Sequence, residues 1–234
     1  MSEQLPLALR WAAHQRFESY VVGANATALG LARSAAEQSD ALRVFIAGPA
    51  GSGRTHLLIA ACAAAGALNR SAQYLDLGAL SEPREHAIRS FHGSHLLTVD
   101  NVDAIAGAHD SEHALFDLYN RCRAEGSSLI FAANVHPARL GIGLPDLVSR
   151  LAASTQVVLH PLDEAARRNL LQQRAAARGI DLDEPVLDWL FARRARDLGS
   201  LMILLERIDQ AALAAQRRVT VPFLRGLFAG DVEA

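Results

Sequence analysis

One glycine-rich segment of this chain has the residue types and spacing of a loop that cradles nucleotide phosphates. It reads Gly48, Pro49, Ala50, Gly51, Ser52, Gly53, Arg54 and Thr55. The pattern is G-x-x-x-x-G-[KR]-[ST], in which glycines let backbone N–H groups turn towards phosphate oxygens. The helix expected to start near Thr55 adds the positive end of its dipole, and the Thr55 hydroxyl is suited to bind Mg²⁺. The alternative is a glycine-rich turn without a ligand.

Arg54 stands where the pattern usually has lysine. Its guanidinium is longer and planar, so we expect it to fit the β- and γ-phosphates less well than an ammonium group does. All 23 basic residues of the chain are arginine, and none is lysine. Arg54 can therefore reflect a preference of the whole chain rather than a change at this site.

An acidic residue ends an apolar run further along the chain. The run covers residues 96–100 and ends in Asp100, whose carboxylate could hold Mg²⁺ through water. Asn101 follows, where many ATPases of this kind have a glutamate that orients the attacking water. An amide cannot act as a carboxylate base, so we expect slow hydrolysis by the chain itself.

Two further polar residues are candidates whose local sequence is less informative. Asn134 follows an apolar run at 128–133 and could orient water beside a γ-phosphate, or it could simply form a turn before His136 and Pro137. Arg150 lies near the end of a short predicted helix, where an arginine is usually solvated surface. Local sequence does not decide between the two interpretations of Asn134, and it gives Arg150 no function.

Alternating strand and helix patterns place these residues in an α/β fold. Apolar runs typical of buried strands cover 43–47, 73–76, 96–100, 128–133 and 156–160, with helical patterns at 55–65, 82–91 and 111–125. This alternation predicts a five-stranded parallel sheet covered on both faces. After Pro161 only helical patterns follow, at 164–178, 185–194, 198–217 and 222–228. We therefore expect a tail at 1–16, an α/β domain at 17–160 and a helical lid at 161–234.

Composition excludes several classes of protein. The formal net charge of −2 does not suit a module that binds duplex DNA, so we expect no direct sequence-specific DNA binding. Cys62 and Cys122 lie inside apolar helical patterns and predict neither a zinc site nor a disulfide framework. No signal peptide or membrane span is apparent, which favours a cytoplasmic protein without a membrane partner.

Together the motifs resemble those of the DnaA-related AAA+ ATPases, and within them most closely the family of Hda, the regulatory inactivators of DnaA. The matching residues span most of the chain. They are Phe17, 21–23, Asn25, 51–58, Asp100, Asn101, 116–121, 144–151, 215–218 and 220–223. Arginine in the loop and Asp-Asn after the third strand resemble Hda rather than DnaA.

The resemblance implies a function for each matching residue. Phe17, Val22 and Asn25 would flank the adenine of ADP or ATP, and His56 would complete the nucleotide-binding set. Asn134 would be the residue known as sensor I. Arg150 would be an arginine finger acting in trans on ATP bound to DnaA.

The N-terminus carries a second feature of the family. Gln4, Leu5, Leu7 and Leu9 resemble the Gln-Leu-x-Leu-x-Leu peptide by which Hda docks on the DNA polymerase sliding clamp. An extended tail with spaced leucines can insert into an apolar groove while the glutamine makes polar contacts. DnaA and the sliding clamp are therefore the implied partners.

One family position lacks its usual residue. Gly199 falls where DnaA-type proteins carry a sensor II arginine at the start of a lid helix. Arg196, three residues earlier, is about one helical turn away and is the nearest substitute. Either Arg196 reaches the phosphates, or the chain senses nucleotide poorly or not at all.

Four functions are compatible with these features. The first is a regulatory adaptor that binds nucleotide, docks on the clamp and triggers hydrolysis by DnaA. The second is an autonomous ATPase such as a helicase loader, which Asn101 and Gly199 disfavour. An origin-binding initiator is disfavoured because few residues follow the last predicted helix, and a nucleotide-free scaffold is the fourth. Self-association into a homo-oligomer and the identity of the bound nucleotide stay open.

Overall fold

The computed structural model describes residues 15–193 and 198–229, and it contains the predicted parallel sheet. All five strands are parallel, in the order β2-β3-β4-β1-β5. Their bounds are β1 Arg43–Ala47, β2 Ala72–Asp76, β3 Leu96–Asp100, β4 Ser128–Ala133 and β5 Thr155–Val158. The fifth strand begins one residue earlier and ends two residues earlier than predicted. The α/β fold class is confirmed.

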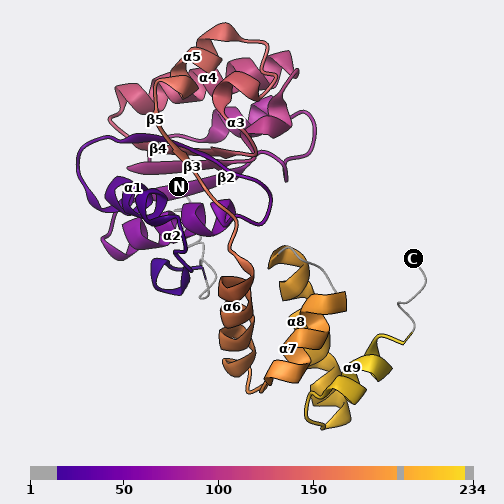
Figure 1. Cartoon of the computed structure of the whole chain (residues 1–234). Coiled ribbons are helices and arrows are strands. Elements are labelled where there is room, and N and C mark those ends of the chain that lie inside the picture. Colours follow the sequence, from indigo (N-terminus) through magenta and orange to yellow (C-terminus); the bar gives the residue numbers. More distant parts are fainter. Residues whose placement is uncertain (1–14, 194–197, 230–234) are drawn as a thin grey trace, which may run out of the picture. The chain divides into compact units, whose positions relative to one another are not determined.

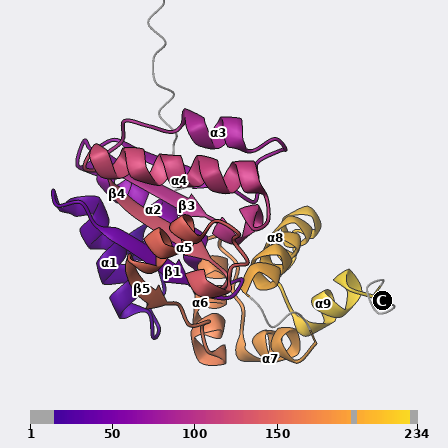
Figure 2. The same ribbon diagram turned by 90° about the horizontal axis from the view of Figure 1, so that it is seen from above.

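Helices cover both faces of the sheet, as Figures 1 and 2 show. One face carries α1 (Ala26–Glu37) and α2 (Arg54–Ala67), and the other carries α3 (Glu85–Ser90), α4 (His109–Ala124) and α5 (Pro145–Ala152). Helix α1 was not among the helices that the sequence predicts. Its buried face consists of four alanines, which contrast little in hydropathy with the exposed face.

The described residues from 162 onward form a second compact unit, separate from the unit formed by the described residues up to 161. Its described helices are α6 (Glu164–Ala176), α7 (Glu184–Arg193), α8 (Leu198–Ala215) and α9 (Val221–Leu227). They enclose a core of their own around Leu171, Trp189 and Leu205. Asp163 caps α6 by accepting a hydrogen bond from the Ala166 N–H at 2.8 Å. The predicted helical lid is therefore present.

The carboxyl ends of the strands meet at one edge of the sheet. The register pairs Asp76 of β2 with Asp100 of β3, while Gly48 and Asn134 directly follow β1 and β4. The described part of the chain also contains the 3-10 turns η1 at Phe17–Ser19, η2 at Val102–Ile105 and η3 at Pro137–Arg139. Within the described residues, no helix has the length and apolar character needed to cross a membrane.

Candidate nucleotide-binding site

The glycine-rich loop connects β1 to α2, and its surroundings leave no room for a side chain at two of its glycines. A Cβ atom at position 48 would lie 2.8 Å from Ser52 Oγ and 2.9 Å from Leu159 Cβ. Gly53 has a φ of +96°, and a Cβ there would lie 2.9 Å from Tyr20 Cε2. The buried Ser52 hydroxyl has no hydrogen-bond partner among the described residues. A glycine cradle with an unused polar group suits an anionic ligand.

Thr55 and Asp100 lie in direct contact at the edge of the sheet. Thr55 Oγ1 donates to Asp100 Oδ2 at 2.6 Å, and the Tyr74 hydroxyl donates to the same oxygen at 3.2 Å. Asp100 Oδ1 accepts from the Asn101 N–H at 2.9 Å, and its side chain is fully buried. Burial, together with the nearby carboxylates, raises the pKa of Tyr74, which keeps this hydroxyl protonated as a donor.

This pair fits the Mg²⁺ ion that the loop implies. A hydroxyl and a carboxylate are the hard oxygen ligands that Mg²⁺ prefers, with phosphate oxygens and water completing its coordination. Thr55 and Asp100 would hold the ion. A bound Mg²⁺ ion would neutralise charge on the phosphates. Elsewhere among the described residues, no group of three or more His, Cys, Asp or Glu side chains could hold a metal ion.

Asp103 connects the loop arginine to the predicted sensor. Asn134 donates to Asp103 twice, from its backbone N–H at 3.0 Å and from Nδ2 at 2.7 Å. Arg54 Nη1 lies 4.0 Å from Asp103 Oδ1, and the Arg54 side chain is only 10% exposed. The sequence did not single out Asp103. Its position in η2, just after β3, was the only available signal.

The Asn101 side chain is hydrogen-bonded within the protein and cannot serve as a base. It adopts a left-handed backbone conformation with a φ of 53°, and its Nδ2 donates to Asp76 Oδ1 at 2.7 Å. The same Asp76 oxygen accepts from the Gly78 N–H at 2.9 Å. The amide thus ties the end of β3 to the end of β2.

Residues before α1 pack against the loop. Phe17 is buried, and His56 Nε2 lies 2.9 Å from the Arg16 carbonyl oxygen. The Tyr20 ring contacts His56 edge-on, with ring centroids 5.3 Å apart. Burial raises the pKa of Tyr20 to about 12. Val22 is half-buried and packs against the apolar cluster that contains Phe17 and Tyr20. Tyr20 is a neighbour of the loop that the sequence did not indicate.

Asn25 joins two distant segments of the α/β unit. Its Nδ2 donates to the His160 carbonyl oxygen at 2.9 Å, and its Oδ1 accepts from the His160 N–H at 2.8 Å. The side chain is almost completely buried. The Asn25 amide therefore pairs with the backbone of His160, just after β5, in the way that a neighbouring strand would. This pairing uses the amide oxygen and one of the two amide N–H groups.

Arg150 lies at the other edge of the sheet. It borders a cavity together with Arg43, the first residue of β1, and Thr155, the first residue of β5. The phosphate loop follows the opposite end of β1. From Arg43 to Ala47 the strand rises four times by one residue, which amounts to roughly 13 Å. Arg150 is thus not part of the phosphate cradle of its own chain.

Glu112 anchors the segment that leads into the helix of Arg150. Its buried carboxylate accepts from the N–H groups of Gly107 at 2.8 Å, Gly143 at 3.0 Å and Leu144 at 2.9 Å. Leu144 is the N-cap of α5, so Glu112 satisfies a backbone group at the start of that helix. A lone glutamate in an amphipathic helix gives no signal of this contact in sequence.

Some predicted residues lie outside the described part of the chain. These are the four residues of the tail motif, Gln4, Leu5, Leu7 and Leu9, and the substitute arginine Arg196. Gly199 is described and is exposed in the first turn of α8. The position expected for a sensor II arginine therefore presents no side chain.

Comparison with protein families gives two adjoining matches. The bacterial DnaA ATPase domain matches residues 12–158, and the lid domain of Hda matches residues 163–228. The boundary between these matches coincides with the division between the two compact units.

Solved structures share the fold at low sequence identity. Domain III of the Thermotoga maritima replication initiation protein DnaA has a TM-score of 0.80 at 21% identity, covering 96% of this chain and 99% of that chain. AMPPCP-bound DnaA from Aquifex aeolicus has a TM-score of 0.70 at 22% identity, covering 85% of this chain and 66% of that chain. The Thermotoga maritima RuvB branch migration motor has a TM-score of 0.66 at 17% identity, covering 92% of this chain and 71% of that chain.

Proposed function

From the premise that this chain belongs to the DnaA-related AAA+ family and carries the lid domain of Hda, we propose that it regulates replication initiation by acting on DnaA. It binds ADP or ATP with Mg²⁺, docks on the sliding clamp and promotes hydrolysis of ATP held by DnaA. The single observation that carries this proposal is the Hda lid match directly after a DnaA-type ATPase domain. The geometry around Arg150 and Asn101 supports it.

Arg150 is the residue proposed to act on the partner's nucleotide. It lies at the sheet edge opposite its own phosphate loop, and no described residue forms an ion pair with it. A finger arginine stabilises charge that develops on the transferred phosphoryl group, an effect worth roughly 10³–10⁵ in rate. Asn134 acts as sensor I through its contact with Asp103.

The nucleotide serves as a structural ligand rather than as fuel in this proposal. Asn101 replaces the usual glutamate base and is hydrogen-bonded to Asp76. The amide cannot accept a proton from water, so intrinsic turnover is slow. In this proposal Phe17, Val22, Asn25 and His56 supply the surface for the adenine; Phe17 and Val22 belong to the apolar cluster that packs around α2. AMPPCP in the Aquifex DnaA structure is consistent with an adenine nucleotide as the ligand.

Reconstitution tests the proposal directly. The full chain is mixed with ATP-loaded DnaA, DNA and clamp loaded on DNA, and released phosphate is measured with wild-type protein and with Arg150→Ala. We expect stimulation with the wild type and a loss to the unstimulated rate with the variant. Normal stimulation by Arg150→Ala, while the variant unfolds at the wild-type temperature, would overturn the role of Arg150.

Clamp docking is tested separately. A peptide of residues 1–12 and the full chain are titrated against the clamp, with Gln4→Ala as the variant and Glu3→Ala as the matched control. We expect binding by the peptide and the chain, weakened at least 10-fold by Gln4→Ala. Stimulation of DnaA that does not depend on the clamp would indicate a different adaptor.

A further inference from the structure

A cavity of about 360 Å³ lies at the amino ends of β1 and β5, between α4 and α5. Its lining combines a few small and apolar residues with arginines from three different elements. The lining residues are Ala41, Leu42, Arg43, Tyr119, Arg123, Arg150, Ala153 and Thr155. Its volume falls at the lower end of the range for ligand pockets.

The charge of this cavity is uncompensated. Arg43, Arg123 and Arg150 border it, and no carboxylate does. Within the described ranges, none of these three guanidinium groups forms an ion pair or a hydrogen bond, and Arg43 Nε is buried without a partner. Three cations around one cavity repel each other unless an anion joins them.

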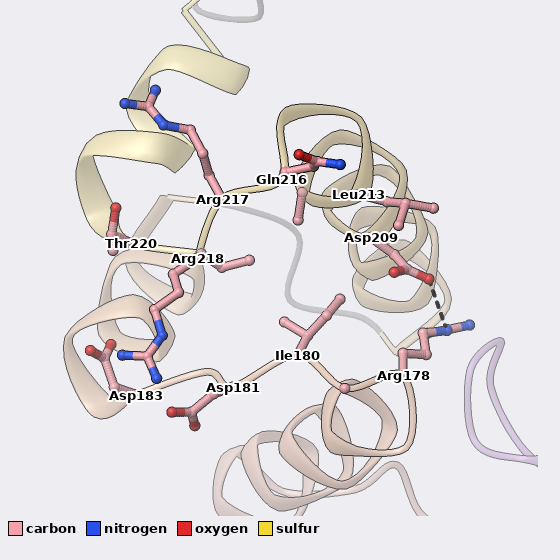
Figure 3. Close-up of a pocket in the computed structure, with 13 residues that line it drawn as sticks. Arg178, Ile180, Asp181, Asp183, Asp209, Leu213, Gln216, Arg217, Arg218 and Thr220 are labelled. Atoms are coloured by element: carbon pink, nitrogen blue, oxygen red, sulfur yellow. Dashed lines mark ion pairs between the residues drawn. The ribbon is translucent and has the colours of Figure 1, made fainter.

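A pocket in the lid shows the contrasting case. It holds about 510 Å³, and its arginines share the lining with Asp181, Asp183 and Asp209 (Figure 3). Arg178 Nε lies 3.6 Å from Asp209 Oδ2. The positive charges of the lid pocket therefore face negative ones from the same unit, and the pocket has no need of an anionic ligand.

The chemistry of the arginine cavity favours phosphate groups. A guanidinium presents its donors in a planar fork that matches a phosphate bidentately, and it is less strongly hydrated than an ammonium group. The half-buried Arg43 would lose little further hydration when it binds such a group. Tyr119, whose ring stacks on Phe131 with centroids 6.0 Å apart, gives the cavity a rigid wall beside the arginines.

We propose that Arg43 and Arg123 join Arg150 in one anion site, which receives the phosphate chain of a nucleotide held by a second AAA+ subunit. This inference rests on the proposed function and adds two residues to it. The chain's own nucleotide is not the ligand, because the phosphate loop lies at the opposite edge of the sheet. Arg43 and Arg123 bind the terminal phosphates directly and hold them against Arg150.

The test uses the full chain in the stimulated hydrolysis reaction with ATP-loaded DnaA and loaded clamp. Arg43→Gln, Arg123→Gln and Arg123→Lys are compared with Arg150→Ala, and Arg89→Gln serves as a control because Arg89 is exposed and does not border this cavity. We expect Arg43→Gln and Arg123→Gln each to raise the concentration for half-maximal stimulation 5- to 20-fold. Arg123→Lys should recover only part of this loss, since it keeps the charge but lacks the planar fork of the guanidinium group.

Failure of this inference is distinguishable from failure of the proposed function. If Arg150→Ala abolishes stimulation while both glutamine variants behave like Arg89→Gln, the finger stands and the three-arginine site is wrong. A free anion is tested by titrating inorganic tripolyphosphate into ADP-saturated protein. Binding that depends on the three arginines, combined with unchanged stimulation by the glutamine variants, would overturn the assignment to a partner's nucleotide.

Discussion

Asn134 Nδ2 donates a 2.7 Å hydrogen bond to Asp103 Oδ2, which joins the predicted sensor to the carboxylate that faces the loop arginine. Asp103 is thus a negative charge beside the place where phosphates are expected, and it partly neutralises Arg54. Because like charges repel, we expect Asp103→Asn to tighten ADP binding several-fold. Calorimetric titration measures this, with the exposed Asp40→Asn as control. Equal binding would contradict this repulsion, and weaker binding would show that Asp103 is needed for orientation.

The Thr55–Asp100 contact leads to a prediction about Mg²⁺. Thr55 Oγ1 donates to Asp100 Oδ2 at 2.6 Å, so both oxygens are available to one ion. We expect Mg²⁺ to strengthen ADP binding by the wild type and Thr55→Ala to lose most of that strengthening. ADP titrations in Mg²⁺ and in EDTA give the ratio of affinities. Thr55→Ser, which keeps a hydroxyl, should retain the dependence, and an unchanged ratio in Thr55→Ala would exclude this ion site.

The Asn25–His160 pair should stabilise the α/β unit. Its two hydrogen bonds, at 2.9 and 2.8 Å, join segments that are 135 residues apart. Removing both in Asn25→Ala should lower the free energy of unfolding by about 1–3 kcal/mol. Urea unfolding at pH 7 measures the loss, and Asn25→Asp should be no more stable than Asn25→Ala, because it places a buried carboxylate against the His160 carbonyl oxygen. An Asn25→Ala chain as stable as the wild type would contradict this role.

Stability should fall at alkaline pH through buried thiols and phenols, since the chain has no lysine. Burial raises the pKa of Cys62 from 9.0 to about 12, so the folded chain holds this proton more tightly than the unfolded chain does. The resulting stabilisation is complete below pH 9 and is lost as the pH rises from 9 to 12. For this group alone the slope is at most about 1.4 kcal/mol per pH unit.

Cys62→Ala removes this contribution while leaving the other groups in place. Urea midpoints measured from pH 8 to pH 11 should fall less steeply for Cys62→Ala than for the wild type. Cys122→Ala is a useful comparison, because burial raises the pKa of Cys122 only to about 11. Parallel curves for the wild type and Cys62→Ala would contradict the assignment.

Contiguous motifs were readable in the sequence, and long-range contacts were not. The phosphate loop, Asp100 and the strands carry their pattern within a few residues, so sheet, lid and loop could be predicted. The hydrogen bonds of Asn25 to His160 and of Glu112 to Gly143 join segments that are far apart in the sequence. No local spacing of residues indicates either pair. Helix α1 buries alanines, which give little periodic contrast. The resemblance assigned Asn25 to the nucleotide, and that assignment stays a prediction; the hydrogen bonds of its amide to His160 could not be read from the sequence.

Glu112 gives the last prediction, because its carboxylate supports the segment that positions Arg150. The N–H groups of Gly107, Gly143 and Leu144 all donate to it. Glu112→Ala should leave these groups without a partner and cost about 2–4 kcal/mol of stability. Glu112→Gln keeps one acceptor oxygen and should cost less.

The effect on stimulation separates positioning from stability. At a temperature where both variants are folded, we expect Glu112→Gln to lower the saturating rate of DnaA-bound ATP hydrolysis several-fold while nucleotide binding by the chain itself is unchanged. The reason is that α5 begins at Pro145, next to the segment that Glu112 holds, whereas the phosphate loop follows β1. Asp117→Asn, on the same helix, is the control. A Glu112→Gln chain that is destabilised yet stimulates at the full rate would show that Glu112 supports the fold and has no part in aiming Arg150.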